Sequence, residues 1–197
     1  MKDNNKKQPV NKRLVILQTL ATLLEEDSME RITTAKLAAA LQSSEAALYR
    51  HFSKKSDMFN ALIDFAETSL LDLFTKIRER EDLNSIARIQ TMMSVMLDFA
   101  TINKGICKVL TGHAVVDEDP ALTERLSALY AKFETVFRQT YRDAIAEGLL
   151  PADFNATTRA SLTLSYVLGR WTIFVLSHYR EKINGLTAVT LATFTAP

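Results

Sequence analysis

The sequence has little of what a disulfide framework, a metal site or a membrane span needs. Its 197 residues include one cysteine, three histidines, five glycines and four prolines. The single Cys107 excludes an internal disulfide and is typical of a reducing cytoplasm. The most apolar window, residues 162–176, is interrupted by polar residues and is shorter than the roughly 20 residues that a membrane span requires. We therefore expect a cytoplasmic protein that does not enter a membrane.

Catalytic patterns are absent from the sequence as well. No HExxH, CxxC, glycine-rich phosphate loop or GxSxG motif occurs in it. Cys107 and His113 are the nearest pair that could supply a nucleophile or a metal ligand, but six helical residues place them about 240° apart around the axis. The sequence therefore predicts no enzyme activity, no metal site and no cofactor.

The low content of glycine and proline, with alanine, leucine and charged residues dominating, predicts an all-α protein. Apolar residues at helical spacing predict helices over 10–26, 55–80, 86–101, 120–147, 155–180 and 186–194, with two short helices within 33–52 and one within 106–114. Asp119 followed by Pro120 is typical of a helix N-terminus, and Gly148 of a helix C-terminus.

Positive charge gathers at the N-terminal end. Residues 1–55 hold ten Lys or Arg against six Asp or Glu, a net charge of about +4, whereas the whole chain carries +1. The remainder therefore carries about −3. DNA affinity comes largely from neutralising phosphates, so we expect DNA at the basic end, which begins with a basic arm at residues 1–9.

The stretch 33–52 predicts two short helices with a tight bend between them. Thr33 or Thr34 can cap the first helix, and Ser44 can cap the second. Ala46 and Ala47 leave the front of the second helix low enough to enter a DNA major groove. The predicted DNA-binding residues are Thr33, Thr34, Lys36, Ser44, Glu45, Ala46, Ala47, Tyr49, Arg50, His51 and Lys55.

This stretch, with Thr-Thr-Ala-Lys-Leu-Ala-Ala-Ala before the bend and Ser-Glu-Ala-Ala-Leu-Tyr-Arg-His-Phe after it, resembles the helix-turn-helix of the TetR family of dimeric DNA-binding proteins. The resemblance implies a three-helix DNA-binding domain at 1–54 and a helical dimerisation and regulatory domain at 55–197. Gln42 stands where the family usually has Gly, Ser43 where it has an apolar residue, and Ser53 where Pro is common. A non-glycine residue forced to positive φ costs on the order of 1 kcal/mol, so we expect some strain at Gln42.

The helix predicted from Asn155 is apolar on more than one side, which indicates a second buried face. The TetR resemblance places a four-helix dimer interface here, made with the final helix. The alternative is that this helix is central in a monomeric core. The predicted homodimer residues are Leu164, Leu168, Trp171, Phe174 and Val175.

Within that family, residues 31–48 and Val-Leu-Thr-Gly-His-Ala at 109–114 resemble the nucleoid occlusion factors. That resemblance implies a nucleoid-associated protein that binds sites across the chromosome and, when bound, restrains assembly of the tubulin-like division protein FtsZ. The matching partner-binding positions are Phe65, Val95 and Asn103, while Asp98 and Ile102 stand where Gly and Arg are expected.

Two other functions stay open from the sequence. The first is a ligand-responsive TetR-type repressor with a small-molecule pocket between its long helices. The second is a helical enzyme with a borrowed N-terminus, although no catalytic constellation supports it.

Overall fold

The computed structural model describes residues 11–26, 31–115, 118–183 and 188–195, and these fold into helices without a strand. The predicted basic arm lies outside the described residues. The helices are α1 (Lys12–Glu25), α2 (Thr34–Ala40), α3 (Glu45–Tyr49), α4 (Lys55–Arg78), α5 (Ser85–Ile102), α6 (Lys104–Leu110), α7 (Pro120–Ala146), α8 (Ala156–Leu176) and α9 (Ala188–Thr195). The all-α prediction is therefore confirmed.

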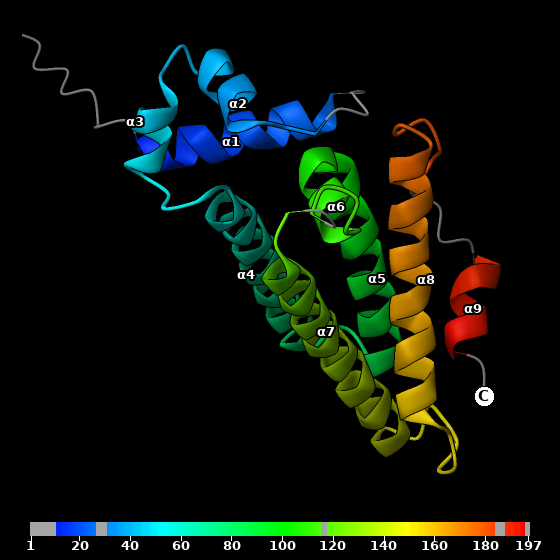
Figure 1. The fold of residues 1–197 in the computed structure, drawn as a ribbon. Helices are drawn as coiled ribbons and strands as arrows, with labels where there is room; N and C mark the ends of the chain where they lie inside the picture. Colours follow the sequence, from blue (N-terminus) through cyan, green and yellow to red (C-terminus); the bar gives the residue numbers. More distant parts are fainter. Residues whose placement is uncertain (1–10, 27–30, 116–117, 184–187, 196–197) are drawn as a thin grey trace, which may run out of the picture.

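Helices α1 to α3 gather at one end of the molecule, and α4 leads away from them into a bundle of longer helices (Figure 1). In that bundle α7 packs against α4, α5 and α8, while α9 lies along the outer side of α8 (Figure 1). Helices α6 and α4 of the bundle pack against α1, and α6 does so more extensively. The arrangement places the predicted DNA-binding segment at one end and the predicted dimer helix along one side.

Aromatic side chains fill the interior of the bundle. The Phe74 ring of α4 lies 5.7 Å from the Phe133 ring and 6.0 Å from the Phe137 ring of α7, measured between ring centroids. Tyr141 is also buried, and its hydroxyl lies 2.7 Å from the Thr163 hydroxyl of α8 and donates to the Phe194 carbonyl of α9. Full burial of such side chains stabilises a fold by about 1.5 to 3 kcal/mol each.

Two predicted helices end earlier in the structure than the sequence suggests. The helix expected to reach residue 114 stops at Leu110, because Gly112 adopts a φ of 83°. The helix expected to reach residue 180 stops at Leu176, because His178 and Tyr179 adopt φ values of 52° and 61°. The residues after both ends are mostly polar, as in Ser177 and His178, and helical spacing alone predicted these ends a few residues too late.

Four of the five predicted dimer residues are buried within the chain itself, and their place in a dimer interface stays a prediction. Trp171 is fully buried, and its indole nitrogen donates to the Met96 carbonyl at 3.0 Å. The other buried side chains of this group are Leu164, Phe174 and Val175, and Leu168 is partly buried.

Within the described ranges, no helix is long and apolar enough to cross a membrane.

Candidate nucleic-acid interface

Hydroxyl side chains start both helices of the helix-turn-helix. Thr33 is the N-cap of α2, and its hydroxyl oxygen accepts a hydrogen bond from the Lys36 amide at 3.1 Å. Ser44 is the N-cap of α3, and its hydroxyl oxygen accepts from the Ala47 amide at 3.2 Å. Each hydroxyl accepts a hydrogen bond in its cap and still has its own hydrogen, so both can donate a hydrogen bond to DNA.

The bend between α2 and α3 carries the strain that its sequence predicted. Gln42 has a φ of 50°, the left-handed conformation for which glycine is the favoured residue. The bend is closed by backbone hydrogen bonds from the Gln42 amide to the Ala39 carbonyl at 3.0 Å and from the Ser43 amide to the Ala38 carbonyl at 2.9 Å. These bonds satisfy carbonyls at the end of α2 and hold α3 at a fixed angle to it.

Helix α3 presents a low, polar outer surface. Leu48 is buried and anchors the helix, whereas Ser44, Ala46 and Tyr49 are exposed and Ala47 is half-buried. The Thr34 hydroxyl donates to the Glu45 carboxylate, which ties the start of α2 to the first turn of α3. The remaining predicted contacts, Lys36, Arg50 and His51, lie at least partly in solvent around this surface. An α-helix of this profile fits the DNA major groove, and the base and phosphate contacts stay predictions.

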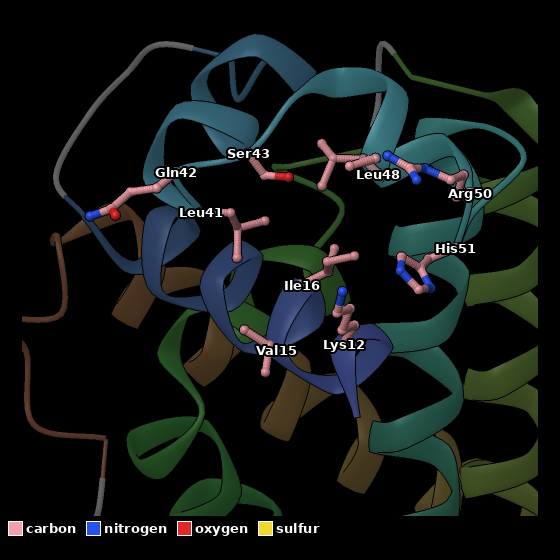
Figure 2. Close-up of a pocket in the computed structure, with 10 residues that line it drawn as sticks. Lys12, Val15, Ile16, Leu41, Gln42, Ser43, Leu48, Arg50 and His51 are labelled. Atoms are coloured by element: carbon pink, nitrogen blue, oxygen red, sulfur yellow. The ribbon is translucent and has the colours of Figure 1, made fainter. Parts of the chain in front are cut away.

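A cleft of about 570 Å³ lies beside this surface (Figure 2). Its walls come from α1, from the bend and from α3, and Figure 2 shows Lys12 and His51 on the same side of it. Among the described residues that line it, Lys12, Arg50 and His51 are basic and none is a carboxylate. The cleft therefore extends the cationic surface from α3 to the start of α1.

Arg13 has a role that the sequence did not assign to it. Its guanidinium lies 4.0 Å from the centroid of the Phe52 ring and donates to the His51 carbonyl at 2.7 Å. These contacts pin the first turn of α1 to the segment that follows α3. The basic residues around Arg13 suggested DNA binding, but the sequence pattern did not predict that Arg13 packs against Phe52.

Lys55 has a different partner from the one predicted. Its ammonium forms an ion pair with Glu118 at 2.5 Å, and its side chain is only 19% exposed. The ammonium also lies 5.6 Å from the centroid of the Phe59 ring. Neighbouring Lys54 is well exposed and pairs with Asp119 at 2.9 Å. In this arrangement the Lys55 ammonium is paired within the protein, and its contact with a DNA phosphate stays a prediction.

The predicted partner-binding residues fall near a second groove, of about 360 Å³, between α1, α4 and the junction of α5 with α6. Phe65 is 50% exposed and Ile102 is 78% exposed, and both line this groove together with Asn103 and Lys104. Val95 does not line it and packs partly against the core instead. The structure thus brings together Phe65 and Asn103, two of the three predicted residues.

Helix α8 has an exposed face that the predicted dimer residues do not form. Leu162, Ile173 and Leu176 are about half exposed or more. Ser165 and Gly169 lie between them at spacings of three or four residues, which places all five on one side of the helix. Among the described residues, and apart from the neighbouring residues and backbone of its own helix, no heavy atom lies within 4 Å of the position that a Gly169 side chain would occupy. This face is apolar, and its middle is low enough for another helix to approach closely.

Both the N-terminal and the C-terminal part of the chain match known protein families. Residues 16–62 match the family of bacterial regulatory proteins called the tetR family, and residues 83–192 match the SlmA-like version of the tetracyclin repressor-like C-terminal domain. The nucleoid occlusion factor SlmA of Shewanella halifaxensis is 42% identical over 173 residues, which cover 88% of this chain and 87% of that protein. The same factor from Shewanella sediminis is 40% identical over the same shares of both chains.

Solved structures agree on the fold. The fatty acid degradation regulator FadR from Bacillus halodurans superposes with a TM-score of 0.81 at 12% identity, covering 96% of this chain and 97% of that one. FadR from Bacillus subtilis, solved in complex with stearoyl-CoA, gives 0.74 at 11% identity over 93% and 97% of the two chains. At such low identity the likeness supports only the fold. The two matched domains and the 40–42% identity over most of the chain show that it belongs to the TetR family of regulatory proteins and, within it, to the SlmA group.

Proposed function

We propose that this protein is a homodimeric, sequence-specific DNA-binding protein that acts in nucleoid occlusion by restraining FtsZ assembly. The observation that carries the proposal is that α1 lines both the groove with Phe65 and Ile102 and the cleft beside α3. The names of the SlmA relatives support nucleoid occlusion, and the surface of α3 supports DNA binding. A DNA-binding regulator, rather than an enzyme, fits these features.

The exposed face of α8 supports the homodimer. A two-fold pair of α8 helices packed through Leu162, Gly169 and Ile173 would present two copies of α3 to half-sites about 34 Å apart. Such a dimer predicts binding to a roughly palindromic duplex.

A matched set of aspartate variants tests this interface. Ile173→Asp is expected to give a folded monomer, because it places a charge on the exposed face. Trp171→Asp is expected to unfold the chain, because it buries a charge in the core of the protomer. Leu149→Asp, at a similarly exposed leucine after α7, is the control and should stay dimeric in sedimentation. A dimeric Ile173→Asp protein would move the interface off this face.

The groove supports a partner with an apolar and acidic segment. Phe65 and Ile102 supply exposed apolar surface, and Lys104 supplies a cation next to Ile102, where the resemblance leads one to expect arginine. Lys104 lies 3.1 Å from the Glu25 carboxylate, so an incoming acidic group would compete with Glu25 for it. The groove thus keeps a positive charge at Lys104, two residues after position 102, where the resemblance leads one to expect arginine.

Two assays on one pair of variants test the partner. Phe65→Ala is expected to bind DNA as the wild type does but to lose the slowing of FtsZ polymer assembly in the presence of DNA. Leu73→Ala, an exposed leucine on the same helix outside the groove, should keep both activities. A wild-type protein without any effect on FtsZ would favour the ligand-responsive repressor, and a genome-wide map with only one or two promoter sites would do the same.

A further inference from the structure

One carboxylate contacts both flanks of the helix-turn-helix. Arg31 lies two residues before the N-cap of α2, and Lys55 is the first residue of α4, just after the helix-turn-helix ends. Both donate to the same oxygen, Oε1 of Glu118, at 2.8 Å for Arg31 Nε and 2.5 Å for Lys55 Nζ. The Glu118 side chain is only 7% exposed. A single buried carboxylate therefore links the chain before α2 to the chain after α3.

The next residue joins this carboxylate to the bundle. Asp119 is the N-cap of α7, and its Oδ1 accepts a hydrogen bond from the Ala121 amide at 3.0 Å. Its other oxygen pairs with Lys54 at 2.9 Å. Because Asp119 is fixed at the start of α7, the position of Glu118 follows from the position of that helix. Helix α7 packs in turn along α8, which carries the exposed apolar face.

The charge on Glu118 is stable in this setting. Burial by itself would raise the pKa of the Glu118 carboxyl, but hydrogen bonds from Arg31 and Lys55 outweigh burial and lower that pKa. The carboxylate is therefore ionised at neutral pH. Glu118 and Lys55 are largely shielded from solvent, whereas the Arg31 side chain is 59% exposed. Neutralising Glu118 removes the anion that holds both cations, so the cluster is expected to open.

We propose that Glu118 is a positioning residue for DNA binding, which fixes the orientation of α3 relative to α7 and α8 by holding Arg31 and Lys55. The inference rests on the proposed dimeric DNA binding, because the spacing of two α3 helices matters only in a dimer. In a dimer built on α8, the path from α8 through α7 and Glu118 sets how far apart the two recognition helices lie. Lys55 then acts through Glu118 and not through a DNA phosphate.

Distance measurement between spin labels in the free dimer tests the orientation directly. A label at Ala40→Cys, an exposed position at the end of α2, reports the separation of the two DNA-binding ends. The native Cys107 is fully buried and its pKa is raised to about 12 by burial, so it does not compete for the label at neutral pH. Glu118→Gln is expected to broaden the distance distribution, and Lys55→Gln should broaden it in the same way.

The matched control is Glu134→Gln, the same substitution in an i,i+4 pair with Arg138 on α7. It should leave the distribution unchanged. A Lys55→Gln protein that weakens DNA binding but keeps a narrow distribution would make Lys55 a plain phosphate contact. An unchanged width in Glu118→Gln overturns the proposal.

Binding to spaced half-sites gives the functional readout. One inserted base pair moves the half-sites by about 3.4 Å and rotates them by about 35°, which a rigid dimer should resist strongly. We expect the penalty for this insertion to be smaller by about fivefold or more in Glu118→Gln than in the wild type. Tighter binding with an unchanged spacing preference would instead make Glu118 a competitor of the DNA phosphates and overturn the inference. If the wild type selects no palindrome, the proposed function fails, and the spin-label result still decides the role of Glu118.

Discussion

Gly105, the second residue of α6, lies against the backbone of α1, and replacing it by alanine is expected to push the two helices apart. A side-chain carbon at Gly105 would lie 2.8 Å from the carbonyl carbon of Ala21 and closer still to its oxygen. Real side-chain carbons essentially never come within 3.0 Å of another heavy atom. The obstructing atoms belong to a helix backbone, so no side-chain rotation relieves the clash.

The magnitude follows from two opposing effects. Forcing extra volume into a packed interior costs about 1 to 3 kcal/mol, and replacing glycine by alanine inside a helix returns about 0.5 to 1 kcal/mol. The net loss for Gly105→Ala is then up to about 2.5 kcal/mol, or a fall in melting temperature of up to about 10 °C for a chain of this size. Because α1 carries the helix-turn-helix, a shift of α1 should also weaken operator binding by about tenfold or more.

Gly148→Ala is the matched control for this experiment. Gly148 has a φ of 74°, so alanine there is strained by about 1 kcal/mol, but no atom lies within 4 Å of the new carbon. The control should therefore lose a similar amount of stability without moving α1, and its operator affinity should match the wild type. Thermal unfolding at one protein concentration and fluorescence anisotropy with labelled operator would measure both quantities. A Gly105→Ala protein with wild-type stability and affinity would refute the reasoning.

Two further substitutions have predicted outcomes. Gln42→Gly is expected to raise the unfolding free energy by about 0.5 to 1 kcal/mol, because it relieves the positive φ at the bend, and unchanged or lower stability in urea titration would contradict this. Glu67 receives hydrogen bonds from Arg125 and Lys132; burial alone would raise its pKa, but these two partners lower it below the usual 4.5. Because the pKa of Glu67 is lower in the folded state, its ionised carboxylate stabilises the protein above pH 4.5, and this stabilisation is lost as the pH falls through the folded-state pKa. Glu67→Gln should therefore reduce the unfolding free energy by about 1 kcal/mol at pH 7 and by less near pH 3.

The local signals in the sequence predicted the DNA-binding end well. Thr33 and Ser44 are caps in the structure, and Gln42 has the strained φ that the missing glycine implied. Caps and bends depend on residues only a few positions apart, so a short stretch of sequence contains the information that forms them. The all-α fold followed for the same reason from helical spacing.

The two sides of α8 could not be told apart from the sequence. Trp171 points into the protomer, whereas Ile173, two residues later, is about half exposed. When a helix is apolar on both sides, periodicity shows that two faces are buried but not which one meets its own chain. The sequence analysis assigned Trp171 to the dimer interface, whereas in the structure it is buried and its indole contacts the Met96 carbonyl.

Contacts between residues far apart in the sequence could not be predicted from the sequence either. Glu118 meets Lys55 and Arg31 across 63 and 87 residues of sequence. The position of Glu118 before Pro120 suggested only a helix start, because the charge pattern near α7 contains no information about which cations lie opposite it. Gly105 likewise lies just before the short helix predicted within 106–114, and only the packing of α6 on α1 reveals why a side chain does not fit there.

Helix α1 is the physical link between the two proposed activities. Its Arg13 donates a hydrogen bond to the His51 carbonyl just after α3, which attaches α1 to the helix-turn-helix. Leu14 and Ala21 of the same helix line the groove with Phe65. Gly105 allows α6 to approach the same helix, so the groove and the DNA-binding end share one wall. If DNA binding changes the angle of α1, it also changes the groove. By linkage, a partner in the groove would then change the affinity for DNA by the factor by which DNA changes the affinity for that partner. The proposed function needs a protein that acts on its partner when bound to DNA, and we propose the shared α1 wall as the route of that dependence.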